Sequence, residues 1–582
     1  MKKQKAPIGL YHNPLTEWGL KALMKNTAVP IRKGLPPAQY DSIVSEECEI
    51  TMSDGVRLHA SLRLPHTNGK FPVVLIRNPY SNTNLMWLSV LPVFAEQGYA
   101  AVLVNVRGTI DSEGSWTPFI HEREDGRDVI DWIVAQPWCD GNIGAFGASY
   151  LGHSQWAIAD YHHPALKTLF ISVYGAAPYN TFYRRGMFRQ EIWTQWATQM
   201  MEDNRYKLLL PPKLVPKMLS YKPQISLGEY LKAKPCKWYN EWITNTKASD
   251  PYWSEGFWGE FERSVKDVDI PIFLHGGWFD IFLRPQLEAF RNLPEHVREK
   301  SRFLIGPWNH GGSPVGDIEF PNQSVGDFLF VKPSLEWFDA HLKGKIYSKP
   351  VGVVEAYDIG SGCWKTFAND ITAQKEVSLY LAGNQKLETV SVQNGDISFV
   401  YDPENPVPSL GGNMLGSGGM SAPGGVKKQP PVGAREDVIS FVSDPFTRKF
   451  SIVGKMQAEL YVASDVPATA FTVTVSEVYA SGECYNICDD ITDIRWRDEK
   501  TVENYYPGDV VKLHIELLDV VWTVKPGSRI RVDISSSNFP MYHVHPNTDK
   551  PWAEQISVCK AKQHIYFGEG TPSKIVIPVE NP

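Results

Sequence analysis

The residues best suited to chemistry in this sequence are one serine, one aspartate and one histidine, each of which follows a short apolar run. Ser149, Asp280 and His310 occur in that order along the chain. A serine hydroxyl is a weak nucleophile unless a histidine removes its proton and an acid orients that histidine. We therefore predict acyl transfer to Ser149, with His310 as the base and Asp280 as the orienting acid.

The segment around Ser149 has the composition of a sharp turn between a strand and a helix. Such a turn exposes the serine hydroxyl and requires small neighbours, because its backbone is strained. Gly147 is one small neighbour, whereas Leu151 stands where a second glycine is usual and Gly152 follows one residue later. The motif alone is weak. The serine, aspartate, histidine order is the one that the α/β-hydrolase fold uses, and it makes the prediction specific.

Apolar runs that alternate with helix-type segments predict a largely parallel sheet with crossover helices. The alternation stops where aromatic-rich helical segments predict an inserted domain, and it then resumes. Ligands of such sheets bind at the carboxyl ends of strands, where all three residues fall. Near the C-terminus, short strands separated by turns predict a sandwich or jelly roll. The predicted core strands are residues 73–76, 100–106, 143–146, 168–173, 270–274 and 301–305.

The sequence therefore predicts an α/β-hydrolase core with an inserted helical cap and a C-terminal all-β jelly-roll domain. A chain of 582 residues exceeds one hydrophobic core, so several domains are expected. The predicted segments are an N-terminal extension (1–44), the first part of the core (45–176), the helical cap (177–267), the second part of the core (268–348) and the β-sandwich or jelly roll (349–582).

Composition and charge limit the partners. With a net charge of -7 and no long basic block, nucleic acid is not an expected partner. Since no apolar stretch approaches the roughly 20 residues that span a bilayer, no membrane partner is expected either. Seven scattered cysteines indicate reduced thiols and a cytoplasmic location. The oligomeric state is left open, including a homo-oligomer.

An oxyanion that develops on the substrate needs hydrogen-bond donors already in place. The backbone N–H of Tyr150, the residue after the nucleophile, is the natural first donor. Tyr80 follows the predicted strand at 73–76, and its hydroxyl is the candidate for the second. Packing alone is the alternative role of Tyr80.

Several motifs in one order resemble the cocaine esterase and Xaa-Pro dipeptidyl-peptidase family. The resemblance extends over residues 45–582 and implies the same three-part fold, the triad of Ser149, Asp280 and His310, and an oxyanion hole formed by Tyr80 and Tyr150. The displacement of the glycine after the serine is itself typical of that family. The motifs are Arg-Asn-Pro-Tyr at 77–80, Arg-Gly at 107–108, Gln-Pro-Trp-Cys-Asp-Gly at 136–141, Gly-Ala-Ser-Tyr-Leu-Gly at 147–152, Gly-Gly-Trp-Phe-Asp at 276–280 and Gly-Pro-Trp-Asn-His at 306–310.

Within that family, enzymes that hydrolyse α-amino esters have an acidic pair shortly after the triad aspartate. Here Ile281, Phe282 and Leu283 follow it, which argues against that activity. An aromatic-rich insertion suits an apolar or aryl acyl group. We therefore predict a serine hydrolase of carboxylic esters, with aryl or bulky acyl groups as a hypothesis. The predicted pocket residues are Phe182, Tyr183, Trp193, Trp196, Trp278 and Trp308.

Three alternatives stay open: an amide or peptide hydrolase, an acyltransferase, and a binding module with a vestigial core. Glu191, Glu202 and Asp203 in the insertion are candidates to hold the free amino group of a peptide. The substrate is then a small-molecule ester or amide, and no cofactor is needed.

Other signals are given structural roles. Neither the histidines at 543 and 545 nor the cysteines at 484 and 488 have partners that complete a metal site, so no metal is predicted. The acidic run at 122–125 is interpreted as a solvated helix cap.

Overall fold

A computed structural model describes residues 32–580 except residues 33, 82, 202–212, 232, 234–235, 324–329, 392 and 416–423. Most of the predicted N-terminal extension, as well as Glu202 and Asp203, lies outside the described residues. Unit 1 comprises Met1–Ser172, Asp269–Phe273 and Ser324–Lys349, and unit 2 comprises Val173–Val268, Leu274–Gln323 and Pro350–Pro582. The segment boundaries drawn from the sequence stay predictions.

Unit 1 contains the first part of the α/β core. Its sheet begins with the antiparallel hairpin β1–β2, and the later strands pair in parallel around β3 and β5. Every residue of β3 and β4 is buried, as expected for strands covered on both faces. The strand order is β1 (Ile43–Thr51), β2 (Arg57–Pro65), β4 (Ala100–Asn105), β3 (Phe71–Asn78), β5 (Cys139–Ala148) and β6 (Leu166–Ser172), with the start of β9 (Ile272–Phe279) beside β6.

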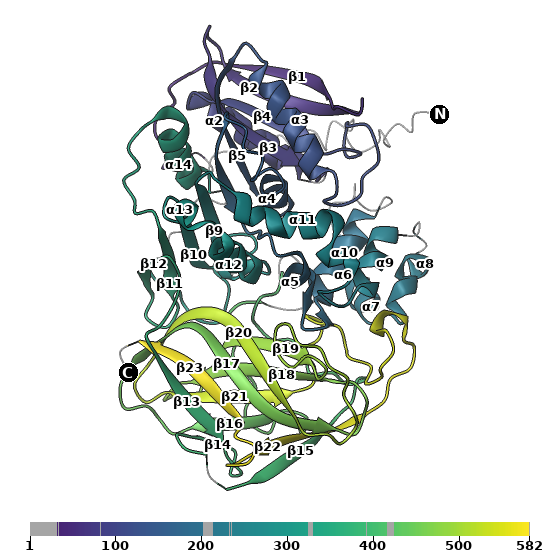
Figure 1. Ribbon diagram of the computed structural model, residues 1–582. Helices are drawn as coiled ribbons and strands as arrows, with labels where there is room; N and C mark the ends of the chain where they lie inside the picture. Colours follow the sequence, from purple (N-terminus) through teal and green to yellow (C-terminus); the bar gives the residue numbers. More distant parts are fainter. Residues whose placement is uncertain are drawn as a thin grey trace. The chain divides into compact units, whose positions relative to one another are not determined.

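Helices cover both faces of this sheet (Figure 1). Helices α2 (Asn84–Glu96) and α14 (Val331–Lys343) share one face, where Phe94 and Phe338 are 6.2 Å apart between ring centroids. Helices α3 (Glu122–Val134) and α4 (Tyr150–Trp156) contact each other and β5. The predicted α/β core is therefore confirmed.

Unit 2 contains the end of β9 and then β10 (Arg302–Asn309), β11 (Val353–Asp358) and β12 (Cys363–Ala368), in that order across the sheet. Helices α12 (Leu283–Asn292) and α13 (Glu295–Arg298) connect β9 to β10. The predicted insertion of short helices is also present. Its elements are α5 (Pro178–Phe182), β7 (Tyr183–Arg184), β8 (Met187–Phe188), α6 (Gln190–Met200), α7 (Val215–Leu219), η1 (Gln224–Ser226), α8 (Leu227–Tyr230), α9 (Lys237–Thr244), α10 (Pro251–Ser254), α11 (Gly256–Ser264) and η2 (Val265–Asp267).

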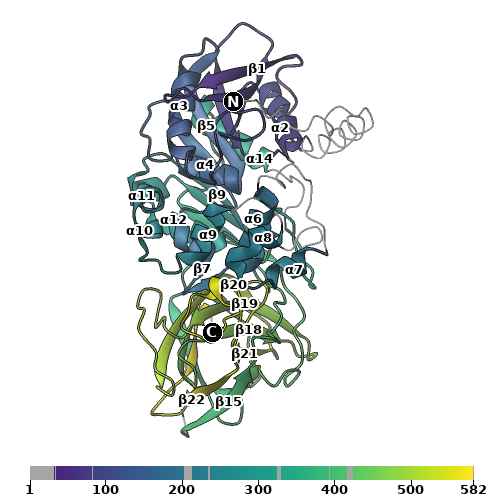
Figure 2. The ribbon, with the colours of Figure 1, turned by 90° about the vertical axis from the view of Figure 1, so that its right-hand side faces the viewer.

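The C-terminal part of unit 2 is an all-β domain. Among the described residues, eleven strands form one hydrogen-bonded sheet, in which β18, β19 and β21 lie side by side (Figure 2). The strands are β13 (Lys375–Leu381), β14 (Lys386–Glu388), β15 (Gly395–Tyr401), β16 (Ile439–Ser443), β17 (Phe450–Ser464), β18 (Ala470–Val478), β19 (Cys484–Asp493), β20 (Val511–Val524), β21 (Arg529–Ser535), β22 (Ala561–Phe567) and β23 (Lys574–Glu580). A long Gly/Pro-rich segment at 403–431 lies between β15 and β16, and its residues 416–423 fall outside the described part.

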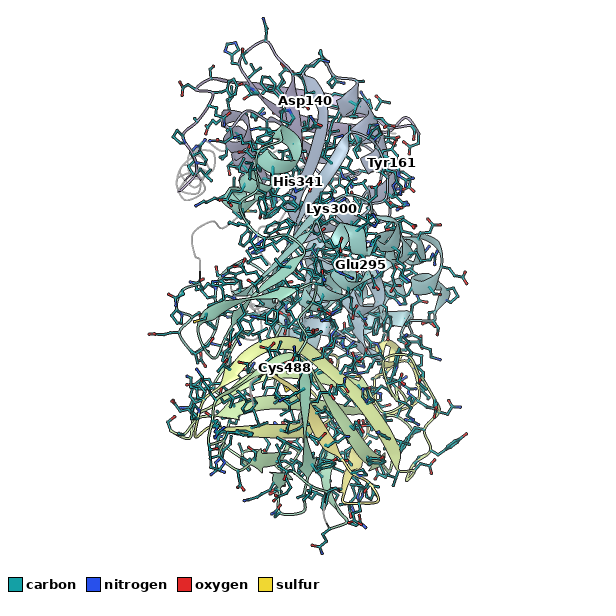
Figure 3. All side chains as sticks on the ribbon, turned by 60° about the vertical axis from the view of Figure 1, so that its left-hand side comes forward. Asp140, Tyr161, Glu295, Lys300, His341 and Cys488 are labelled. Atoms are coloured by element: carbon teal, nitrogen blue, oxygen red, sulfur yellow. The ribbon has the colours of Figure 1, made fainter. Side chains whose placement is uncertain are left out.

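All seven cysteines are free thiols. Cys488, on β19, is shown in Figure 3, and burial raises the pKa of its thiol well above the usual value. In the part of the chain that the structure describes, we find no helix with the length and apolar character needed to cross a membrane.

Candidate active site

Ser149 occupies the turn between β5 and α4, as predicted. Its backbone has φ +58° and ψ -125°, a conformation that side-chain-bearing residues rarely adopt and that costs about 1–3 kcal/mol. Hydrogen bonds on both sides hold this turn: the Ser149 N–H donates to Ser172 O (3.0 Å), and the Ser149 carbonyl accepts from Gly152 N–H (2.8 Å). The strain presents the serine side chain at the end of the strand, because the chain reverses there into α4.

Gly147 is required by close packing rather than by its sequence motif alone. A Cβ atom at this position would lie 2.5 Å from Cβ of Leu151, which is closer than two non-bonded carbon atoms approach each other. Leu151 itself is fully buried. The residue that replaces the usual second glycine is therefore the one that makes the first glycine necessary.

The structure brings the two predicted oxyanion-hole residues together in unit 1. The rings of Tyr80 and Tyr150 are 6.1 Å apart and nearly perpendicular. Asn78, at the end of β3, fixes the Tyr80 backbone: its Nδ2 donates to Tyr80 O and its Oδ1 accepts from Tyr80 N–H, both at 3.1 Å. Tyr80 is thus placed by the residue that ends the preceding strand.

The side chain of Tyr150 is held by a buried polar network that the sequence analysis missed. Its hydroxyl donates to Glu122 Oε1 (2.9 Å) and accepts from Phe119 N–H (2.8 Å). Arg77 forms an ion pair with Glu122 at 3.4 Å. Burial, opposed by Arg77, raises the pKa of Glu122 to about 7.

The prediction of a solvated cap at 122–125 is wrong for two of its residues. Glu122 and Asp125 are only 2% and 3% exposed, and Asp125 is paired with Arg107. An available signal was the pair of arginines, Arg77 and Arg107, that stand at or just after the ends of β3 and β4 and need buried anionic partners.

Asp280 and His310 are the residues that directly follow β9 and β10. His310 Nδ1 and Asp280 Oδ2 are 2.6 Å apart, and Asp280 Oδ1 accepts from Phe282 N–H at 2.7 Å. The aspartate is fully buried, whereas the imidazole is 17% exposed. Because Nδ1 faces the carboxylate, Nε2 is the ring nitrogen that can accept a proton.

The predicted strands at 270–274 and 301–305 end too early. The observed strands run on to Phe279 and Asn309, through the Gly-Gly and Gly-Pro pairs that follow the predicted strands. At Gly277, a Cβ atom would lie 2.2 Å from Trp308 O. This glycine lets the two strands approach closely just before the acid and the base.

Three predicted pocket residues of the insertion pack together. Phe182 and Trp193 stack with ring centroids 4.1 Å apart, and Trp193 and Trp196 are 5.8 Å apart. Tyr183 is fully buried and donates its hydroxyl to Trp242 O. These contacts make the four aromatic residues part of the insertion's own core.

Phe282 contacts both this aromatic core and the base, His310. Phe282 is 5.9 Å from Trp193 and 5.4 Å from His310 between ring centroids. The other two predicted pocket residues are anchored elsewhere, since Trp278 Nε1 donates to Tyr357 O (2.6 Å) and Trp308 Nε1 donates to Gln323 Oε1 (3.2 Å). The pocket assignment stays a prediction, to which the structure adds Phe282.

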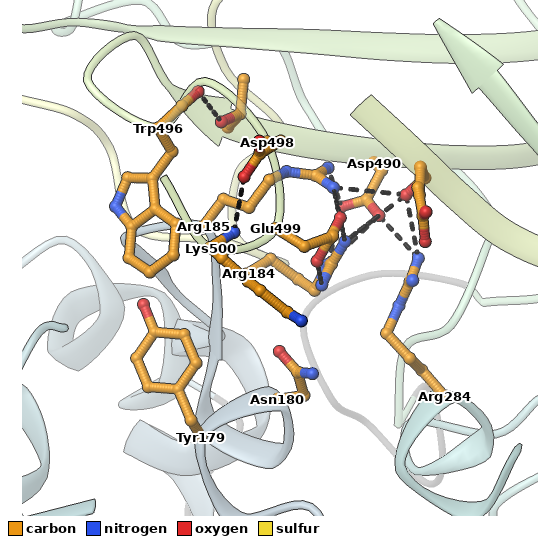
Figure 4. A network of polar contacts seen from close by, with 12 residues as sticks. Tyr179, Asn180, Arg184, Arg185, Arg284, Asp490, Trp496, Asp498, Glu499 and Lys500 are labelled. Carbon is orange, nitrogen blue, oxygen red and sulfur yellow. Dashed lines mark hydrogen bonds and ion pairs between the residues drawn. The ribbon is translucent and has the colours of Figure 1, made fainter. Parts of the chain in front are cut away.

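A charged cluster within unit 2 shares a small cavity with Asp280. Arg284, four residues after Asp280, is 2.7 Å from Asp490 Oδ2, and Arg184 and Arg185 reach the same carboxylate at 3.0 and 3.2 Å (Figure 4). Although burial opposes them, these arginines lower the pKa of Asp490. A cavity of about 30 Å³ is lined by Asp280, Arg284, Asp490 and its neighbour Asp489, among others.

Asp489 differs from Asp490 in its partners, so a change to asparagine is expected to affect the stability of the fold in opposite directions at the two positions. It accepts a hydrogen bond from Asn538, and burial together with Asp490 raises its pKa to about 7. The folded state therefore binds more protons than the unfolded state between about pH 4 and 7, so stability falls as pH rises through that range. Above pH 7, where the carboxyl is ionised in both states, the full penalty is present.

We expect Asp489→Asn to remove this penalty, because the amide mimics the neutral carboxyl. The variant should match the wild type at pH 4 and have a higher Tm at pH 8, measured by thermal unfolding across this range. The matched change Asp490→Asn should instead lower stability at every pH, by about 3–5 kcal/mol, because it leaves buried arginines unpaired. A pH-independent Tm difference for Asp489→Asn would contradict the assignment.

The histidines considered as metal ligands lie outside the named strands. His543 Nδ1 accepts from Phe188 N–H (2.9 Å), and His545 Nε2 is 3.3 Å from Asp493. Within the described ranges, no group of three or more His, Cys, Asp or Glu side chains is arranged to hold a metal ion.

Comparison with known proteins identifies two successive matches. Residues 54–312 match the family described as X-Pro dipeptidyl-peptidase (S15 family), and residues 347–576 match the X-Pro dipeptidyl-peptidase C-terminal non-catalytic domain. Cocaine esterase of a Rhodococcus species is 27% identical over 92% of this chain and 98% of its own length.

Solved structures share the whole architecture. An aminopeptidase from a marine sediment archaeon of the Thaumarchaeota aligns with a TM-score of 0.81 and 21% identity, over 94% of this chain and 98% of that one. An α-amino acid ester hydrolase aligns with a TM-score of 0.75 and 23% identity, over 94% and 99%. The chain therefore consists of an X-Pro dipeptidyl-peptidase (S15 family) domain followed by the C-terminal non-catalytic domain of that peptidase, and it is a homologue of cocaine esterase.

Proposed function

We propose that this protein is a serine hydrolase that cleaves carboxylic esters through Ser149, His310 and Asp280. The observation that carries the proposal is the 2.6 Å hydrogen bond between His310 Nδ1 and the fully buried Asp280. Ser149, held in a strained turn at the end of β5, supports it. The relationship to cocaine esterase supports an ester as the substrate class.

In the proposed mechanism, Ser149 Oγ attacks the carbonyl carbon of the ester while His310 Nε2 takes the hydroxyl proton. The tetrahedral intermediate collapses, the bond to the alkoxide breaks, and the imidazolium gives its proton to the departing alcohol. Water then attacks the acyl-enzyme, and His310 again takes a proton and returns it to Ser149 Oγ. The products are an alcohol and a carboxylic acid, and Asp280 stabilises the imidazolium in both steps.

We assign the oxyanion hole to the Tyr150 N–H and the Tyr80 hydroxyl. The 6.1 Å contact between the two rings and the hydrogen bonds that fix the Tyr80 backbone support this assignment. Donors held in place before the reaction stabilise the developing charge without reorganisation. The Tyr150 hydroxyl donates to Glu122 and accepts from the Phe119 N–H, and these hydrogen bonds hold the residue that carries the first donor.

We expect a preference for aryl acyl groups, because Phe282 and the aromatic core adjoin the base. Ethyl benzoate should have a kcat/KM about tenfold or more above that of ethyl acetate, since burying an aromatic ring contributes about 1.5–3 kcal/mol. The two esters share a leaving group, so the comparison isolates the acyl group. Phe282→Ala should reduce the benzoate rate more than the acetate rate. Equal kcat/KM values for the two esters would contradict the preference.

Peptide hydrolysis is the second candidate, and the family description and the aminopeptidase of the same fold favour it. A dipeptidyl-peptidase needs an anion for the free amino terminus. Glu191 is 2% exposed and already accepts from Gln195 Nε2 (3.1 Å) and Leu415 N–H (3.4 Å), which favours an ester hydrolase. Activity on Xaa-Pro anilides in the absence of ester hydrolysis would reverse the order of the two candidates.

Product analysis distinguishes an acyltransferase from a hydrolase, and labelling distinguishes a binding module from an enzyme. An acyltransferase would form more ester than acid when a competing alcohol is present. A binding module would leave a fluorophosphonate probe unreacted at Ser149. The free cysteines support our proposal of a cytoplasmic location.

A further inference from the structure

We propose that Asn413 is a positioning residue that holds the backbone of the triad aspartate. It lies in the loop between β15 and β16 of the all-β domain. The inference deepens the proposed function and rests on it. It assigns a part in the geometry of the reaction to a domain whose family description, over residues 347–576, is non-catalytic.

The amide group of Asn413 uses both of its donors on the chain around Asp280. Asn413 Nδ2 donates to Trp278 O at 2.9 Å and to Asp280 O at 2.7 Å. An asparagine amide has two N–H donors, and each is matched here to one carbonyl. Since these carbonyls stand where β9 ends, the side chain of Asn413 supplies partners at the point where strand pairing stops.

The two residues after the aspartate are held as well. Arg189, from the helical insertion, donates from Nη1 to Ile281 O, and Phe282 N–H donates to Asp280 Oδ1 at 2.7 Å. Residues 280–282 are therefore each fixed by a hydrogen bond. Among these bonds, those from Asn413 reach the backbone of Asp280 itself.

Packing alone does not define the position of residues 280–282. The cavity of about 30 Å³ is lined by Asp280 and Ile281 and also by Asn413, Arg189 and Arg284. A single water needs roughly 10–15 Å³ of such space, so the loop adjoins room for one or two waters rather than a fully packed core. Without the two bonds from Asn413, the Asp280 backbone keeps its hydrogen bonds with Gly277 O (2.9 Å) and Leu283 N–H (3.3 Å), but it gains space into which it can relax.

A small displacement of Asp280 matters because its bond to His310 is short. The two side chains meet at 2.6 Å, and hydrogen bonds weaken steeply with distance and angle. A misplacement of about 1 Å in a catalytic group costs roughly 100-fold in rate. We therefore expect the loss of Asn413 to lower kcat while leaving the binding of a small ester nearly unchanged.

The test uses Asn413→Asp and Asn413→Ala in the full-length protein. Aspartate has the same shape but presents oxygen atoms to two carbonyl oxygens, and alanine removes the amide. For both, kcat for ethyl acetate should fall about tenfold to a hundredfold with KM changed less than about twofold. In Asn413→Ala, which adds no charge, the acidic limb of the kcat/KM profile should move to lower pH, because the protonated base loses part of its anionic partner.

A matched control separates positioning from stability. Asn547, in the same domain, donates from Nδ2 to Cys559 O at 2.7 Å and accepts from Thr469. Asn547→Asp should lower the Tm without moving the pH profile. If Asn547→Asp and Asn413→Asp lower kcat equally at equal loss of Tm, the positioning role is overturned.

A double-mutant cycle with Asp280→Asn distinguishes failure of this inference from failure of the proposed function. If Asn413 acts through Asp280, Asn413→Asp should cause no further loss of kcat in the Asp280→Asn background. Additive losses would overturn the inference while leaving the triad intact. Full activity of Asp280→Asn would instead overturn the proposed function. A folded Asn413→Ala with wild-type kcat and pH profile would also overturn the positioning role.

Discussion

Replacing Ser149 with alanine should lower kcat for ester hydrolysis by about 10⁶-fold, the loss expected when a serine hydrolase loses its nucleophile. No acyl-enzyme can form without Oγ, and what remains is the rate supplied by oxyanion stabilisation and substrate binding. The measurement is steady-state hydrolysis of ethyl benzoate together with a circular dichroism spectrum. The fold should be retained, because alanine keeps the Cβ of Ser149 and the backbone hydrogen bonds to Ser172 and Gly152 involve no side chain.

Ser154→Ala is the matched control for this change. Ser154 lies in helix α4, which begins directly after Ser149, and its hydroxyl donates to Leu151 O at 2.9 Å. Removing that hydroxyl should leave kcat within a factor of about two, because the group takes no part in acyl transfer. If Ser149→Ala kept more than a small fraction of the wild-type kcat, Ser149 would not be the nucleophile.

Asp280→Asn should have the second-largest effect, a fall of about 10⁴-fold in kcat with little change in KM. The asparagine amide would donate to His310 Nδ1 and stabilise the tautomer that carries its proton on Nε2. That nitrogen could then no longer accept the serine proton. Saturation kinetics on ethyl benzoate at several pH values measures both parameters.

The control for Asp280→Asn is Asp317→Asn. Asp317 also belongs to unit 2, and its ion pair with Lys427 spans 2.7 Å near the surface. Partly exposed ion pairs contribute at most about 1 kcal/mol, so kcat should not change. Retention of more than about a tenth of the activity by Asp280→Asn would rule out the orienting role.

The sequence contained enough information to predict the order of the fold and to propose residues for the candidate site. Ser149, Asp280 and His310 each follow an apolar run, and such runs are recognisable because buried parallel strands are apolar throughout. The ends of β9 and β10 were not predictable in the same way. Their Gly-Gly and Gly-Pro pairs have the composition of turns, yet Gly277 is needed inside the strand because Trp308 O approaches it.

Long-range polar contacts could not be read from the sequence. Glu122 was expected in water because most glutamates at helix starts are solvated, and its burial depends on Arg77, 45 positions earlier. Asn413 stands in a Gly-rich loop without periodicity, 133 positions after the aspartate that it contacts. Such partners become visible only when the fold has brought them together.

The role of Ser149 is tested most directly by locating the adduct of a fluorophosphonate probe by peptide mass spectrometry. We expect one adduct, on Ser149, that forms at the rate at which ester hydrolysis is lost. Labelling should be absent in Ser149→Ala and much slower in Asp280→Asn. An adduct on another residue, or complete loss of hydrolysis with Ser149 unmodified, would contradict the assignment of Ser149 as the nucleophile.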